Sequence, residues 1–180
     1  MRFVGVTVAA TVAAIAGAGC DPGSPDAGPT AADTISAVDA NATVARIVDG
    51  DTIDVTIDGR EERIRLTGID TPEIAHAAFG DRPANDAECF AAEAHAFVVA
   101  LLPVGTPLRL ERDVVGRDDY GRLLAYVYRA RDGIFVNYEI VRHGYARPLS
   151  IAPNTAFHDL IVQAARDAEH DDAGLWSACR

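Results

Sequence analysis

The sequence predicts an α+β fold, a small five-stranded β-barrel with about three helices. Residues 51–58 alternate apolar and polar side chains strictly, as a half-buried strand does, and the Asp58-Gly59 pair that follows is a hairpin signal. A longer stretch with helical apolar spacing, residues 88–102, separates the third expected strand from the fourth. Five principal strands interrupted by one helix in this position are typical of a small closed barrel.

The first three strands form an antiparallel meander. Residues 42–49 alternate in part and end at a glycine, residues 51–58 place every second apolar side chain on one face, and residues 61–66 resume the pattern after the turn. Because strand side chains alternate between faces, Arg63 and Arg65 share the face opposite the barrel interior. We interpret Arg63 as a solvated strand residue.

The remaining elements are delimited by residues that end or begin strands and helices. Thr71-Pro72 ends the third strand because proline removes a ladder donor, and Pro103 ends the helix. Residues 108–112 and 123–128 read as two further strands around a charged loop, 113–121. A short strand at 134–136 precedes a short helix at 138–143 that Asn137 is expected to cap. The last helix, residues 155–169, has a buried stripe of Phe157, Leu160, Ile161 and Ala164.

The first 41 residues have the features of an export signal followed by a tether. A basic start and a short apolar run over residues 1–19 predict a signal peptide that is too short to span a membrane with these flanks. The Ala18-Gly19-Cys20 segment favours a lipoprotein with Cys20 lipidated, although Gly17 stands where a lipobox usually has leucine. The alternative is free secretion after cleavage at Ala18. Residues 20–41 are expected to be a disordered tether, and residues 42–180 form the folded domain.

Charge restricts the function classes. The formal net charge is −11, of which the segment before residue 42 carries one arginine and four aspartates, so the domain retains −8. Such an acidic domain argues against tight electrostatic binding of nucleic acid, but not against an enzyme that holds phosphates through a cation and a few arginines. The chain has no lysine, which excludes lysine-based Schiff-base or general-base chemistry.

Acidic side chains and arginines gather at one end of the meander. Asp51 begins the second strand, and Asp70 and Thr71 are expected to end the third strand. In an antiparallel meander these two positions lie at the same end of the sheet, so Asp51 and Asp70 come close together. Two close carboxylates repel unless a cation lies between them, and oxygen ligands suit calcium or magnesium. Arginine forks such as those of Arg65 and Arg122 suit phosphate oxygens. The alternative for each aspartate alone is ordinary turn chemistry.

Three motifs in this order resemble the staphylococcal thermonuclease family: VDGDT at 48–52, RLTGIDTPE at 65–73 and DDYGR at 118–122. The resemblance runs over residues 42–180 and implies an OB-fold. It also implies a calcium-dependent extracytoplasmic endonuclease that acts on DNA, with RNA as a second substrate class, by hydrolysing the 5′ P–O bond and leaving 3′-phosphate ends. The roles it implies are Asp51, Asp70 and the Thr71 carbonyl as Ca²⁺ ligands, Arg65, Arg122 and Glu73 as catalytic residues, and Tyr120 as a substrate-binding residue.

The chain departs from the family pattern at the nucleotide. The family's type member has a lysine where Asp119 stands, and two tyrosines that flank the base where residues 148–152 read Pro-Leu-Ser-Ile-Ala. Base–aromatic stacking is worth roughly 1–3 kcal/mol per base. Its loss is expected to weaken ground-state binding more than chemistry, and therefore to raise the Michaelis constant.

Two cysteines, Cys89 and Cys179, lie in the expected folded domain. If Cys20 carries lipid, Cys89 and Cys179 remain as an even pair in an oxidising compartment, and secreted members of the family show cysteines at such positions. The alternative is two free thiols.

The main alternative function is a non-catalytic OB-fold binding module at the envelope, and a third is a structural lipoprotein that only holds calcium. The expected partners are single-stranded DNA or RNA and, through a lipid on Cys20, a membrane; the chain is expected to be a monomer.

Overall fold

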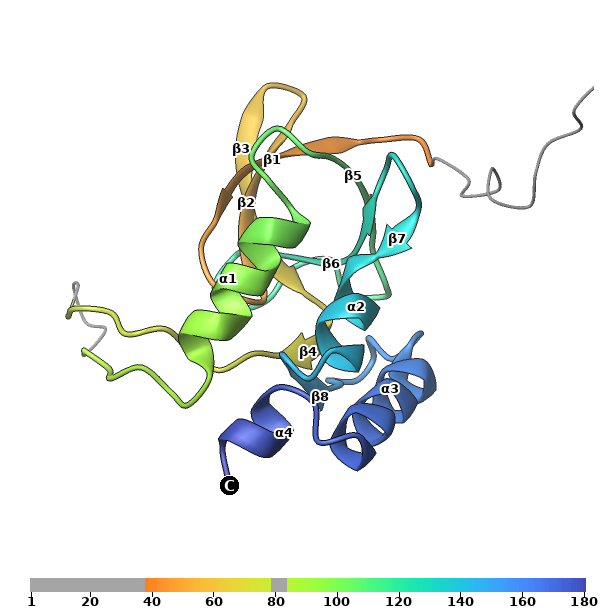
Figure 1. Ribbon diagram of the computed structural model, residues 1–180. Helices are drawn as coiled ribbons and strands as arrows, with labels where there is room; N and C mark the ends of the chain where they lie inside the picture. The colour runs from red at the N-terminus through yellow and green to blue at the C-terminus, as the bar shows by residue number, and fades with distance from the viewer. Residues whose placement is uncertain (1–37, 79–83) are drawn as a thin grey trace, which may run out of the picture. The chain divides into compact units, whose positions relative to one another are not determined.

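The computed structural model describes residues 38–78 and 84–180, so the signal peptide, the lipidation of Cys20 and most of the tether lie outside the described residues. Five strands form a closed barrel: β1 (Ala42–Ile47), β2 (Thr52–Ile57), β3 (Arg60–Leu66), β5 (Pro107–Glu111) and β6 (Leu123–Arg129). Their order is β3-β2-β1-β5-β6, and β3 pairs in parallel with β6 to close the ring (Figure 1). The expected five-stranded OB barrel is confirmed.

The β2–β3 hairpin shows why this sequence makes a tight meander. Asp58 and Gly59 both have positive φ, 49° and 77°, as a two-residue primed turn requires. The side chains that alternate inward from the two strands, Ile53, Val55 and Ile64, are completely buried. Register places Thr52 opposite Arg65, so the start of β2 and the end of β3 lie at one end of the barrel.

In the part of the chain that the structure describes, four helices pack against the barrel or against one another. Helix α1 (Ala91–Leu101) packs Val98 into the core, and α2 (Val136–Arg142) follows the short strand β7 (Ile134–Phe135) and buries Ile140. Helices α3 (His158–His170) and α4 (Leu175–Ala178) gather near α2 at one side of the barrel (Figure 1). Over residues 38–78 and 84–180, no helix combines the length and the apolar character that crossing a bilayer demands.

A second, two-stranded sheet was not predicted. Strand β4 (Gly68–Asp70) pairs antiparallel with β8 (Arg147–Leu149), with Asp70 opposite Arg147. Three-residue strands are too short to show a period, so the sequence pattern gave no sign of them. This sheet fixes Asp70 at the end of the barrel and connects it to the C-terminal part of the chain.

Three sequence-based expectations were wrong in detail. Arg63 is not merely solvated, because its Nε donates to the buried carboxylate of Asp54 at 2.7 Å. Asn137 lies inside α2 rather than at its cap; it accepts from Val127 N–H and donates to the Thr67 carbonyl. Leu160, expected in the buried stripe of the last helix, is 44% exposed, whereas Ile161 beside it is buried.

Candidate active site at the end of the barrel

The turn between β1 and β2 presses closely against Thr71. A Cβ added to Gly50 would lie 2.7 Å from Thr71 Oγ1, closer than a real side chain permits, so only glycine allows this approach. The approach lets Thr71 N–H donate to Asp51 Oδ2 at 2.9 Å. Asp51 also accepts from the Thr52 hydroxyl at 3.0 Å and is 7% exposed. The glycine therefore sets a buried carboxylate directly beside the DTPE segment.

Arg65 joins the two aspartates. Its Nη2 lies 2.8 Å from Asp70 Oδ1 and 3.1 Å from Asp51 Oδ2, so both carboxylates converge on one nitrogen. The other terminal nitrogen, Nη1, donates to the carbonyls of Leu66 and Ile69. The guanidinium is thus held in place by the backbone of β3 and β4, and its side chain is only 14% exposed.

Neighbouring acids make this end of the barrel strongly negative. Burial raises the pKa of Asp70 above its ordinary value, Arg65 opposes the rise, and the charges of Asp51 and Glu73 add to it. Burial also raises the pKa of Asp49 to about 6, with the Gly50 N–H opposing the rise and the charges of Asp51 and Glu73 adding to it. The negative charges of Asp51 and Glu73 therefore act on both Asp49 and Asp70, and a nearby positive charge would favour the ionised form of these two carboxyls.

Glu73 lies beside these acids on an exposed loop. Its backbone is hydrogen-bonded on both sides by Glu88: Glu73 N–H donates to Glu88 Oε2 at 3.1 Å, and Glu88 N–H donates to the Glu73 carbonyl at 2.9 Å. The side chain faces a groove that Asp49, Tyr120 and Arg122 also line. Glu73 is consequently placed between the paired aspartates and the loop of the DDYGR motif.

Arg122 is anchored by Asp118. Its Nε donates to Asp118 Oδ2 at 2.6 Å, and the Tyr120 and Arg122 amides both donate to Asp118 Oδ1. The Arg122 guanidinium lies 5.4 Å from the centre of the Tyr120 ring, which is 86% exposed. The turn therefore presents a fixed arginine and an accessible aromatic ring together.

Two hollows meet at Tyr120 and Arg122. One is the groove with Glu73, which continues along β2 and β3 to Asp54 and Arg63. The other is a cavity of about 380 Å³ that also contains Arg65 and has apolar walls from Val115, Leu149 and Ile151. Arg65 lines the cavity, and Arg122 lines both the cavity and the groove. An anion bound where the two hollows meet would therefore lie near both arginines. An extended ligand with a phosphate at the junction would have room in both directions.

Aliphatic side chains line the cavity on the side of residues 148–152. Leu149 is 40% exposed and Ile151 is 68% exposed, so both offer side chains to a ligand. Asp119 lines the same cavity. The cavity therefore has apolar walls and a carboxylate at its edge.

The structure brings together all seven predicted metal, catalytic and substrate residues at one end of the barrel: Asp51, Arg65, Asp70, Thr71, Glu73, Tyr120 and Arg122. It also contains a disulfide between Cys89 and Cys179, with their Cα atoms 5.8 Å apart. Sequence reasoning missed Asp49, Asp118 and Glu88. The first two lie within motifs already singled out, whereas no local pattern marks Glu88.

Paired carboxylates and two anchored arginines at the end of a closed barrel are the groups that a phosphodiester hydrolase uses. Sequence similarity identifies the family. The profile described as staphylococcal nuclease homologue matches residues 63–178. The chain belongs to the staphylococcal nuclease family and is a nuclease, with nucleic acid as its substrate.

Individual relatives agree with this assignment. The chain is 36% identical over 133 residues to the thermonuclease of Staphylococcus intermedius, an alignment that covers 74% of each protein. It is 34% identical over 134 residues to the thermonuclease of Staphylococcus hyicus, again with 74% of each covered. Endonuclease YncB of Bacillus subtilis is 34% identical over 139 residues, which span 76% of this chain and 62% of that protein.

Proposed function

We propose that this nuclease is a calcium-dependent, extracytoplasmic endonuclease that cleaves DNA, with RNA as a second substrate class, and leaves 3′-phosphate ends. The observation that carries the proposal is the convergence of Asp51 and Asp70 on Arg65, with Thr71 hydrogen-bonded to Asp51. Two carboxylates and a backbone carbonyl form an oxygen-only ligand set, which suits a hard divalent cation.

The residues at this end fit calcium on further grounds. The Thr71 hydroxyl oxygen is buried against the Gly50 turn and has no hydrogen-bond partner among the described residues, so an unsatisfied polar group lies beside the proposed ligands. Within residues 38–78 and 84–180, no three His, Cys, Asp or Glu side chains come together as a metal cluster. The proposed site therefore depends on the Thr71 carbonyl and water to complete the shell. A bound calcium ion would supply positive charge that neutralises the two aspartates and polarises a phosphate oxygen.

The protein's own residues then divide the chemistry. Arg122, fixed by Asp118, donates to phosphate oxygens as charge develops in the five-coordinate transition state. Arg65, whose terminal nitrogens bind Asp51, Asp70 and two backbone carbonyls, adds positive charge from the opposite side of the junction. Glu73 orients or deprotonates the attacking water from the adjoining groove. Tyr120 contacts the nucleotide with its exposed ring.

The end groups of the products test this proposal directly. A labelled single-stranded DNA digested in calcium should yield fragments that a polymerase cannot extend until a phosphatase removes their 3′-phosphates. Fragments that extend without phosphatase treatment would refute the proposed bond specificity. Binding of the DNA without cleavage would instead favour the rival non-catalytic OB module.

We also propose that the mature chain is an envelope lipoprotein anchored through Cys20, with a monomeric domain on a tether. The support is the apolar leader that ends in Ala-Gly-Cys, and the tether composition over residues 20–41. Metabolic labelling with a radioactive fatty acid should mark the wild-type chain and leave Cys20→Ser unlabelled. An unlabelled wild type in the culture medium would favour free secretion.

A further inference from the structure

The loop that carries Glu73 is held by a short ladder. Beyond the two hydrogen bonds between Glu73 and Glu88, His76 N–H donates to Asn85 Oδ1 at 2.9 Å, and Asn85 N–H donates to the His76 carbonyl at 3.2 Å. Residues 73–76 and 85–88 therefore run side by side. The Glu88 carboxylate forms the rung at Glu73 itself, so it fixes the backbone from which the Glu73 side chain projects.

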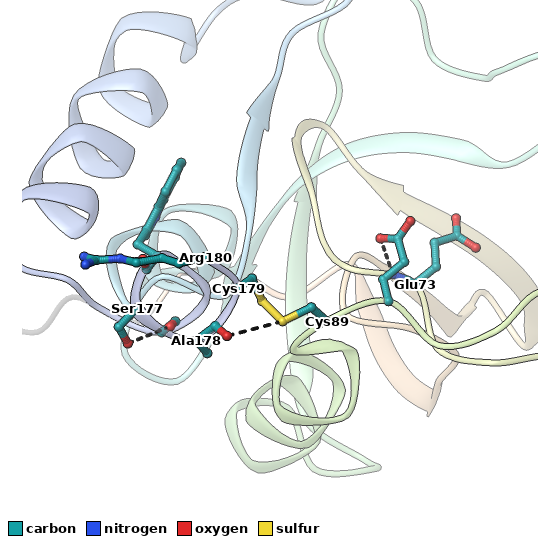
Figure 2. Close-up of a disulfide and its surroundings, with 9 residues drawn as sticks. Glu73, Cys89, Ser177, Ala178, Cys179 and Arg180 are labelled. Carbon is teal, nitrogen blue, oxygen red and sulfur yellow. Dashed lines mark hydrogen bonds between the residues drawn. A yellow bond between two sulfur atoms is a disulfide. The ribbon is translucent and has the colours of Figure 1, made fainter.

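The residue after Glu88 carries a covalent link. Cys89 is bonded to Cys179, which directly follows helix α4 (Figure 2). Figure 2 shows Glu73 and this bridge in one view, with the hydrogen bond to the Glu73 N–H as a dashed line. One end of the Glu73 ladder is thus joined through a single residue to the C-terminal tail.

Helix α4 is itself firmly seated. Leu175 is 1% exposed, and its N–H donates to the Gly144 carbonyl at 2.8 Å. The Trp176 ring lies 4.4 Å from the guanidinium carbon of Arg147, which occupies β8 opposite Asp70 of β4. The tail therefore rests on the small sheet that positions one of the paired aspartates.

These contacts form a continuous path that begins and ends in residues 70–73. It runs from Asp70 through β8 and α4 to the disulfide, and from the disulfide through Glu88 back to Glu73. A carboxylate on an exposed loop needs such restraint, because a misplacement of about 1 Å at a reacting group can lower the rate by roughly 10²-fold.

We propose that Glu88 is a positioning residue for Glu73, and that the Cys89–Cys179 bridge holds Glu88 in register with the paired aspartates. The inference rests on the proposed function, since it takes Glu73 to act on the attacking water. Glu88 contacts the Glu73 backbone and acts through it, so its loss should lower turnover and leave substrate binding nearly unchanged.

A double-mutant cycle tests the positioning role. The turnover number and Michaelis constant for single-stranded DNA are measured in calcium for Glu88→Ala and Glu88→Gln, each in the wild-type and the Glu73→Gln background. Glu88→Ala should lower turnover by about tenfold or more with little change in Michaelis constant. Glu88→Gln should retain turnover, because its amide oxygen still accepts from Glu73 N–H. Asp86→Asn, two residues away and outside this pair of hydrogen bonds, is the matched control and should match the wild type.

The second background separates positioning from stability. In the Glu73→Gln chain, Glu88→Ala should cause no further loss, because there is no longer a carboxylate to position. The Cys89→Ser/Cys179→Ser pair, assayed well below its unfolding temperature, should show the same dependence on Glu73. An equal loss in both backgrounds, or no loss in the wild-type background, would overturn the positioning role alone. A wild-type chain without calcium-supported cleavage would overturn the proposed function and this inference with it.

Discussion

Replacing Arg122 with lysine separates charge from geometry at the proposed transition-state site. Arg122 Nε donates to Asp118 Oδ2 at 2.6 Å, which fixes the direction of the guanidinium, and the side chain is 30% exposed. Lysine keeps the positive charge, but it has no Nε to hold and no planar fork to offer two phosphate oxygens. Asp118 would remain bound to the two backbone amides, so the turn should keep its shape.

The expected magnitude follows from the loss of one fixed hydrogen-bond donor. Loss of one preorganised donor at such a site costs about 3–4 kcal/mol of transition-state stabilisation. At roughly 1.4 kcal/mol for each factor of ten, the rate of the chemical step should fall by about 10²–10³-fold. Arg109→Lys, on β5 and 3.7 Å from Glu111, makes the same exchange of side chains away from the site and should leave the rate unchanged.

Single-turnover cleavage of a short single-stranded DNA at saturating enzyme measures this step without product release. If Arg122 acts in the transition state, the saturated single-turnover rate of Arg122→Lys should be lower than that of the wild type. If the saturated rate matched the wild type and only the enzyme concentration needed for saturation rose, Arg122 would be a binding residue, and its assignment to the transition state would be refuted.

Three further predictions concern stability and binding. Replacing Cys89 and Cys179 by serine removes a cross-link between residues with a sequence separation of 90. In the chain-entropy model this lowers the free energy of unfolding by ~4–5 kcal/mol and the melting temperature by about 15 °C. A calorimetric change in melting temperature below a few degrees would contradict this prediction. Hydrogen bonds from Arg63 and, to a smaller degree, from Arg46 lower the pKa of Asp54 in the folded protein, although burial acts in the opposite direction. The ionised Asp54 therefore stabilises the folded protein above pH 3.8, and this stabilisation is lost as the pH falls below that value. Asp54→Asn should therefore reduce the free energy of unfolding by roughly 1.5–3 kcal/mol at pH 7 and by much less at pH 2, measured by urea titration, and an equal reduction at both pH values would rule out the ion pair as the cause. Changing Leu149 and Ile151 to tyrosine should lower the Michaelis constant for single-stranded DNA with little effect on turnover, since stacking is worth roughly 1–3 kcal/mol per base; an unchanged constant would show that the base does not use this cavity.

The barrel was predictable because its signals are local. Strict alternation, a primed Asp-Gly turn and the helix between the third and fourth strands each follow from neighbouring residues. Strands β4 and β8 could not be found in this way, since three residues give no period and their pairing joins segments about eighty residues apart. The position of Leu160 was also mistaken, because the width of a helix's buried face depends on what packs against it.

The candidate site was partly readable for a related reason. Antiparallel geometry placed Asp51 beside the end of β3, and Arg65 alternates to the correct face. The expectation that Asp70 ends the third strand was wrong, because β3 ends at Leu66 and Asp70 reaches Asp51 on the separate strand β4. The Asp54–Arg63 pair could have been read from the same geometry, because the register of the Asp58-Gly59 hairpin places the two residues opposite each other. The contact of Glu88 with Glu73 was not readable, because it crosses a loop, depends on the tertiary arrangement and leaves no spacing in the sequence.

Calcium dependence of cleavage tests the central claim most directly. The measurement is the initial rate of single-stranded DNA hydrolysis as calcium is titrated from excess chelator, for the wild type and for Asp51→Ala and Asp70→Ala. We expect the wild-type rate to rise from zero to a plateau with calcium, and both variants to show no measurable calcium-supported cleavage, because each loses one of the two carboxylates that converge beside Thr71. Wild-type cleavage that is equally fast in chelator, or variants that follow the wild-type calcium curve, would contradict the assignment.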